Sequence, residues 1–184
     1  MALTVEQIRA TESDEALFEL LSSELERLIP KAYHDERDLY HRKVATLPRG
    51  LRAMAGIQFF NVSMAMDDLA WHFGNQNDER DLRETLDGLR ELGLVEIAEQ
   101  FEWAWEFMKP YMPKLKNGIG CGEFSDGRSF SEWLSDVGAR DFVAPMNEMI
   151  WKYCEQHPKH RLLASCIENA RKHPERFAVA QAYS

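Results

Sequence analysis

Apolar residues recur every three or four positions along most of this chain, which is the spacing of one face of an α-helix. The clearest segment is 78–92, where Leu82, Leu86, Leu89 and Leu92 share one face and acidic side chains lie opposite. No alternation with a period of two is long enough to predict a strand. The sequence therefore predicts an all-α fold.

Capping and breaking residues set the expected ends of the helices. Thr4 with Gln7, and Ser129 with Glu132, have the spacing of capping boxes, and Gly93 suits the residue just after a helix end. We expect a short helix opening at 129 and longer helices over 17–28, 33–44, 51–60, 63–73, 78–92, 94–108, 141–156 and 158–172.

Two of these boundaries depend on single residues. The apolar stretch from 51 to 73 is expected to split near Asn61, and Pro158 suits the first turn of the last helix. The link between the helices at 78–92 and 94–108 is very short, so they should form an αα-hairpin. We expect one compact domain over 1–184, built from antiparallel helical hairpins. Residues 114–128, with four glycines, are the one long irregular stretch, and such loops often bind ligands.

The composition limits the classes of function. The chain has 184 residues, a formal net charge of -9 and a pI near 5.2. Nucleic-acid binders usually carry a basic stripe, so direct binding to nucleic acid or to an anionic membrane is not expected. Basic proteins are the natural partners of an acidic surface, although moderate negative charge also simply keeps proteins in solution.

The sequence also bears on the compartment. No apolar run approaches the roughly 20 residues that a membrane span requires, and the first residues do not resemble a signal peptide. Cys121, Cys154 and Cys166 have neither metal-ligand nor redox-motif spacing, which favours reduced thiols in a cytoplasm.

Negative charge is concentrated between residues 78 and 106, which carry ten acidic residues and three arginines. Within the expected helix 94–108, four glutamates lie inside an arc of about 120° with Trp103 and Phe107 at its edge. This pattern is typical either of an interface or of a solvated face with both aromatic side chains packed under a neighbouring helix. The candidate partner-binding residues are Asp78, Asp81, Glu84, Asp87, Glu91, Glu96, Glu99, Glu102, Trp103 and Glu106.

No pattern in the chain predicts catalysis. Asp67, Asp68 and His72 share a segment, and the i, i+4 spacing of the last two is compatible with a metal or acid–base site. A zinc site requires three or four ligands, so a surface ion pair or a core histidine is the favoured interpretation. The glycines from 118 to 122 lack the context of a phosphate-binding loop, and no Gly-x-Ser-x-Gly motif occurs. We predict no catalytic residue, no cofactor and no metal.

The segment Ala55-Gly-Ile-Gln-Phe-Phe-Asn61, followed by Leu92, Gly93 and Ala98, resembles the bacterial family of DNA-mimic protein 19 over roughly residues 40–155. Ala55 stands where that family's pattern has the first of two glycines. The resemblance implies an all-helical fold without known enzyme activity, in which acidic side chains imitate DNA phosphates and occupy a DNA-binding protein.

The first hypothesis is therefore an acidic protein-binding module, in its sharper form a DNA mimic that occupies a DNA-binding protein or a transcription regulator. A toxin-neutralising protein of the immunity type is a second hypothesis, because small acidic helical proteins suit that role. An enzyme with a site near Asp67, Asp68 and His72 is a third. A homodimer is compatible with each of them.

Overall fold

The computed structural model describes residues 2–33, 36–76, 78–112 and 129–179, and these residues form helices and no strand. The all-α prediction is confirmed. The expected loop at 114–128 and Cys121 lie outside the described residues. The elements are α1 (Val5–Ala10), α2 (Asp14–Leu28), η1 (Lys31–Tyr33), α3 (Arg37–Ala45), α4 (Arg49–Met66), α5 (Leu69–Asn75), α6 (Glu79–Glu91), α7 (Val95–Met108), α8 (Phe130–Asp136), α9 (Ala139–Gln156), η4 (Arg161–Leu163), α10 (Ala164–Lys172) and η5 (Pro174–Arg176).

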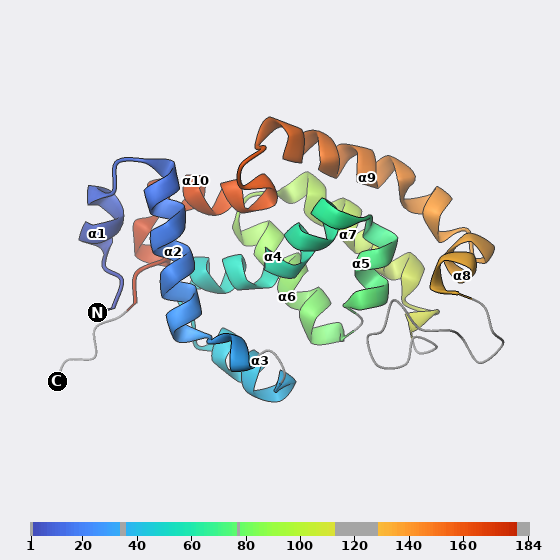
Figure 1. Cartoon of the computed structure of the whole chain (residues 1–184), viewed down its shortest axis with the longest axis horizontal. Helices are drawn as coiled ribbons and strands as arrows, with labels where there is room; N and C mark the ends of the chain where they lie inside the picture. Colours follow the sequence, from blue (N-terminus) through green and yellow to red (C-terminus); the bar gives the residue numbers. More distant parts are fainter. Residues whose placement is uncertain (1, 34–35, 77, 113–128, 180–184) are drawn as a thin grey trace.

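Helix α4 lies at the centre of the molecule, with α2 crossing its first half and α9 running along the upper edge in Figure 1. One hydrophobic core extends from Leu3 to Phe177 and includes the fully buried rings of Phe60, Phe73 and Phe101. Residues near the two ends of the described chain lie side by side, because the Val179 amide donates to the Leu3 carbonyl at 2.9 Å.

Helices α4 and α6 approach each other closely at two glycines. A Cβ atom on Gly56 would lie 2.3 Å from the carbonyl oxygen of Glu84, and a Cβ atom on Gly88 would lie 2.7 Å from the carbonyl oxygen of Ala53. The Thr85 hydroxyl donates to the Gly56 carbonyl at 2.8 Å across the same contact. This packing fixes the position of α6 against the core and therefore places the acidic side chains of α6.

Helix α6 ends at a glycine with a left-handed backbone conformation, which links it to α7. Gly93 has a φ of 80°, its amide donates to the Arg90 carbonyl at 3.1 Å, and the Leu94 amide donates to the Leu89 carbonyl at 2.9 Å. These two hydrogen bonds define a Schellman motif, so the predicted role of Gly93 is confirmed. The antiparallel arrangement of the helical hairpins stays a prediction.

The expected helix break near Asn61 is wrong. Helix α4 continues through Asn61 to Met66, and the Asn61 side-chain oxygen accepts from the Leu162 amide at 2.9 Å. The Asn61 side chain therefore forms its hydrogen bond with a distant segment and does not compete with the helical hydrogen bonds of its own backbone. The break comes later, where Asp68 caps α5 by accepting from the Trp71 amide at 2.8 Å.

The expected start of the last helix at Pro158 is also wrong. Helix α10 begins at Ala164, and the preceding segment contains the short helix η4, whose first residue Arg161 has a φ of 53°. Its guanidinium donates to the Met64 carbonyl at 2.6 Å, at the end of α4. Arg161 therefore combines a left-handed backbone conformation with a contact to a distant helix, and no local sequence pattern indicates either feature.

Candidate functional site

The outer side of α7 carries a row of acidic side chains around one exposed tryptophan. Glu96, Glu99, Glu102 and Glu106 project away from the buried side of the helix, and no lysine or arginine occurs between Val95 and Met108. Trp103 lies among these glutamates with 65% of its surface exposed. We call these five residues the α7 acidic face.

The core side of α7 explains why this face points outward. Its apolar side chains pack into the core, and the fully buried Phe101 contacts the rings of Phe60 and Phe73 with centroid separations of 5.1 and 5.2 Å. A helix with a wide apolar stripe on one side must present its remaining residues to solvent. The α7 acidic face is therefore a consequence of the helical spacing of the sequence.

The acidic residues of α6 behave differently, because two of them, Asp81 and Glu91, are buried or nearly so. Asp81 is 8% exposed and forms an ion pair with Arg37, whereas the Glu91 side chain is 10% exposed. Oxygen atoms of Glu91 lie 2.5 Å from Arg49 and 3.1 Å from Arg176. These carboxylates join α6 to other elements and do not form a free surface.

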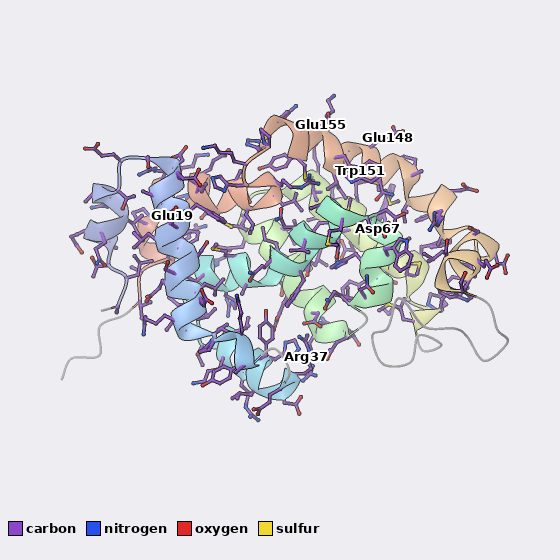
Figure 2. The ribbon with its side chains drawn as sticks, viewed as in Figure 1. Glu19, Arg37, Asp67, Glu148, Trp151 and Glu155 are labelled. Atoms are coloured by element: carbon purple, nitrogen blue, oxygen red, sulfur yellow. The ribbon has the colours of Figure 1, made fainter. Side chains whose placement is uncertain are left out.

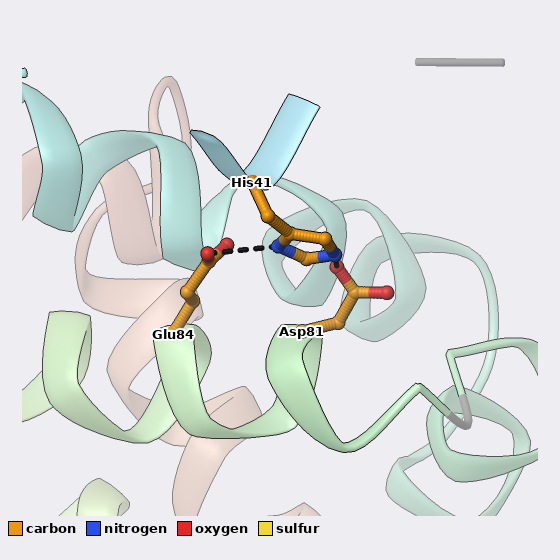
Figure 3. Close-up of side chains that lie close together, drawn as sticks. All are labelled: His41, Asp81 and Glu84. Carbon is orange, nitrogen blue, oxygen red and sulfur yellow. Dashed lines mark hydrogen bonds and ion pairs between the residues drawn. The ribbon is translucent and has the colours of Figure 1, made fainter. Parts of the chain in front are cut away.

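Glu84 belongs to a cluster centred on His41 of α3. Figure 3 shows the imidazole between two carboxylates, with Nδ1 2.8 Å from Oε1 of Glu84 and Nε2 3.6 Å from Oδ1 of Asp81. The guanidinium of Arg37 lies 3.3 Å from Nε2, and it also covers the ring of Tyr40 at 5.2 Å. This cluster connects α3 to α6.

Burial dominates the ionisation of this cluster. It raises the pKa of Asp81 despite the ion pair with Arg37, and it raises the pKa of Glu84 despite the hydrogen bond from His41. Burial also raises the pKa of Tyr40, whereas hydrogen bonds from Arg80 lower the pKa of the more exposed Asp78 to about 2. The cluster is an internal network of opposite charges.

The predicted partner surface is therefore smaller than the ten residues named from the sequence. Six of its nine carboxylates lie in ion pairs or hydrogen bonds with basic groups, including Glu102 with Arg90 at 2.7 Å and Glu106 with Lys109 at 3.1 Å. The other three of the nine, Asp87, Glu96 and Glu99, are exposed and form no ion pair with any described residue. Asp81 and Glu91 form ion pairs with arginines of α3, α4 and η5, and Glu84 accepts a hydrogen bond from His41, so these three predicted partner-binding residues do not form a free acidic surface.

Phe107 and Trp103, the two aromatic residues at the edge of the acidic row, differ in burial. Phe107 is half-buried and stacks on Phe142 of α9 with a centroid separation of 4.1 Å and an interplanar angle of 10°. Trp103 is not packed under a neighbouring helix. The solvated-face alternative predicted that both aromatic side chains pack under a neighbouring helix. This is confirmed for Phe107 and wrong for Trp103.

The site proposed around Asp67, Asp68 and His72 does not form. Asp67 lies at the surface (Figure 2), Asp68 caps α5, and His72 is 1% exposed among the aromatic rings of the core. The Nδ1 atom of His72 is 3.0 Å from the Ser63 hydroxyl, and burial lowers the pKa of His72 to about 3. His72 is the core histidine that the favoured interpretation expected.

One group in the described part of the chain has the residue types of a metal site. Atoms of His41, Asp81 and Glu84 lie within 4.8 Å of one another. The Arg37 guanidinium already contacts Asp81 and the Nε2 atom of His41, so a cationic side chain of the chain itself serves two of the three candidate ligands. The donor set does not fit a metal well, and we interpret it as an ion-pair network.

Sequence reasoning missed Arg37, Tyr40 and His41. They come from a charged helix with little amphipathic character, and their partners lie about 40 residues further along the chain. The available signal was the i, i+4 spacing of Arg37 and His41, which places both side chains on one side of α3.

A groove of about 560 Å³ runs between α4 and α6 beside this cluster. It is lined by Arg49, Arg52 and Arg90 together with Glu84, Asp87 and Glu91. Because three basic and three acidic side chains line it, the groove has no single sign of charge that would select a charged ligand.

Comparisons with models of protein families, with curated proteins and with solved structures give no significant match. The resemblance to the family of DNA-mimic protein 19 stays a prediction. Within the described residues, no helix combines the length and the apolar character that crossing a membrane requires.

Proposed function

We propose that this chain is an acidic protein-binding module whose α7 acidic face receives a basic protein. One observation carries the proposal: Trp103 is 65% exposed among four glutamates, on a helix without a single lysine or arginine. An exposed tryptophan is a costly feature for a free surface, since its large apolar area stays in water. At interfaces the same residue is a frequent anchor.

The charges of this face suit the same role. Acidic groups around an interface steer a basic partner towards it and fix its orientation. The four glutamates also repel one another in the free chain, and contact with cationic side chains relieves that repulsion. Glu102 and Glu106 have exposed partners, but such pairs contribute at most about 1 kcal/mol and exchange readily.

We further propose a DNA-binding protein, such as a transcription regulator, as the partner. Glu106 lies ten residues after Glu96, which is a rise of about 15 Å, or one carboxylate per ~5 Å across the four glutamates. Phosphates of one DNA strand follow at a rise of about 3.4 Å along the helix axis, so measured along each axis the row is sparser than one DNA strand by less than a factor of two. This spacing supports imitation of a short run of phosphates. The cytoplasm is the compartment that we propose for this interaction.

The experiment compares capture of basic proteins by three forms of the full chain from a lysate. We expect the wild type to retain a basic protein at low salt and release it at high salt, since the attraction is screened. The double variant Glu96→Lys with Glu99→Lys should lose the protein. The control variant Glu148→Lys with Glu155→Lys changes net charge equally on α9 (Figure 2) and should retain it.

One result tests protein binding by the α7 acidic face, and a second tests the proposed DNA mimicry. If the α7 variant and the α9 variant capture the same proteins equally well, the α7 acidic face is not the binding surface. For a protein that is captured specifically, added double-stranded DNA should compete if its DNA-binding surface is occupied. A lack of competition would contradict the proposed DNA mimicry and leave the protein-binding role.

A further inference from the structure

The α7 acidic face has a composition that distinguishes between the two basic side chains. This inference rests on the proposed function and concerns the partner's chemistry. Glu99 precedes Trp103 by four residues and Glu106 follows it by three, so their side chains flank the indole on the same side of the helix. The surface thus offers one wide aromatic face with carboxylates on both sides.

Arginine and lysine use such a surface differently. A guanidinium is planar and weakly hydrated, so it can stack on an aromatic ring while its N–H groups donate in the ring plane to carboxylates. The lysine ammonium is compact and strongly hydrated, so it gains less from an aromatic face beside water. A tryptophan bordered by glutamates therefore favours arginine.

The same chain contains an internal example of this arrangement. Arg37 lies over the ring of Tyr40 at 5.2 Å from its centroid, and the same guanidinium forms an ion pair with Asp81. The aromatic ring and the arginine come from α3, and the carboxylate comes from α6. One guanidinium can thus serve an aromatic face and a carboxylate at once, whereas the ammonium of Lys109, which pairs with Glu106, lies further from the ring of Trp105, at 5.9 Å from its centroid.

On the α7 acidic face the aromatic ring and the carboxylates are present, and no cation of the described chain contacts the ring of Trp103. Glu99 is exposed and has no ion pair among the described residues, so its carboxylate is available as an acceptor. The pair of Glu106 with Lys109 is exposed and therefore exchangeable.

We propose that the α7 acidic face recognises an arginine side chain of the partner, with the guanidinium stacked on the indole of Trp103 and donating hydrogen bonds to Glu99. The remaining glutamates attract the neighbouring basic residues without distinguishing arginine from lysine. The partner segment therefore carries arginine at the position that meets the indole.

The experiment uses the full chain and two labelled peptides of equal length and net charge, with arginine in one and lysine in the other at every basic position. We expect the arginine peptide to bind roughly two- to five-fold more tightly, as a cation–π contact at an exposed site allows. Trp103→Ala should remove most of this preference, while leaving salt-dependent binding of both peptides.

Matched controls lie on α9, where Trp151 and Glu155 are also exposed. Trp151→Ala should leave the preference unchanged, whereas Glu99→Gln should reduce it. Equal binding of the two peptides to the wild type, or a preference that survives Trp103→Ala, would overturn the arginine inference while the protein-binding role stands. If neither peptide binds at low salt, the inference and the proposed function both fail.

Discussion

The Nδ1 atom of His41 donates a hydrogen bond to Oε1 of Glu84 at 2.8 Å and thereby joins α3 to α6 across 43 residues of sequence. The other ring nitrogen, Nε2, lies 3.3 Å from the guanidinium of Arg37. An imidazole that donates from Nδ1 can accept from Arg37 at Nε2, so both nitrogens have partners. His41 therefore positions two groups of opposite charge at once.

We expect His41→Ala to destabilise the protein by about 2–4 kcal/mol, because the variant leaves the carboxylate of Glu84 without its donor in a mostly buried site. Urea unfolding followed by circular dichroism measures the change. Arg83→Ala is the control, since Arg83 and Glu79 form an exposed pair. It should cost less than about 1 kcal/mol. A similar small loss for both variants would show that the His41 cluster contributes little to stability.

Gly88→Ala tests the close approach of α4 and α6. The added Cβ atom would lie 2.7 Å from the Ala53 carbonyl oxygen, so the helices would have to separate. We expect a loss of about 2–3 kcal/mol, although alanine is the better helix former by about 1 kcal/mol. Thermal and urea unfolding of the variant measure this loss.

The control for that variant is Gly138→Ala, where a Cβ atom would meet nothing within 4 Å. Gly138 has a φ of 69°, so alanine should cost about 1–2 kcal/mol through its backbone conformation alone. If Gly88→Ala leaves the stability unchanged or increases it, the two helices are not held at the observed separation.

The sequence predicts those parts of the fold that local spacing determines. The helical segments 78–92 and 94–108, the cap at Gly93 and the capping boxes at Thr4 and Ser129 are found in the structure. The errors at Asn61 and Pro158 arise where a side chain or a backbone turn serves a distant element, such as the contact between Asn61 and Leu162. A local pattern contains no information about such a contact.

In the candidate site, too, the sequence predicts what local spacing determines and misses what distant contacts determine. The outward direction of Glu96, Glu99 and Trp103 follows from the helical period of α7, which is a local property. The burial of Asp81 and Glu91 depends on Arg37 and Arg176, which come from distant parts of the chain. Counting charges along α6 therefore overestimated its free acidic surface.

Trp103 should contribute little to the stability of the free chain. Because it is 65% exposed, we expect Trp103→Ala to change the free energy of unfolding by less than about 1 kcal/mol. Phe101→Ala, two residues earlier, removes a fully buried ring and should cost about 3–5 kcal/mol. Urea unfolding of both variants is the measurement. A large loss for Trp103→Ala would mean that the indole serves the fold, and would remove the main argument for a binding role.

His72 should make the protein less stable in mild acid. Burial lowers the pKa of His72 to about 3 from its usual 6.5, so below pH 6.5 the unfolded chain takes up a proton that the folded chain does not. Stability from this residue is therefore complete above pH 6.5 and falls as the pH decreases towards 3. Between pH 7 and pH 4.5 the loss amounts to about 2–3 kcal/mol.

The variant His72→Asn separates this effect from the titration of carboxyl groups. Asparagine keeps a polar atom near the position that faces Ser63 but has no proton to gain in this range. The raised pKa values of Asp81 and Glu84 act in the opposite direction, since the folded chain then binds protons more readily, and they act equally in both proteins. Urea unfolding at pH 7 and pH 4.5 should therefore show a larger loss for the wild type than for the variant. Equal losses would mean that His72 is protonated in the folded chain, which its position among Phe60, Phe73 and Phe101 opposes.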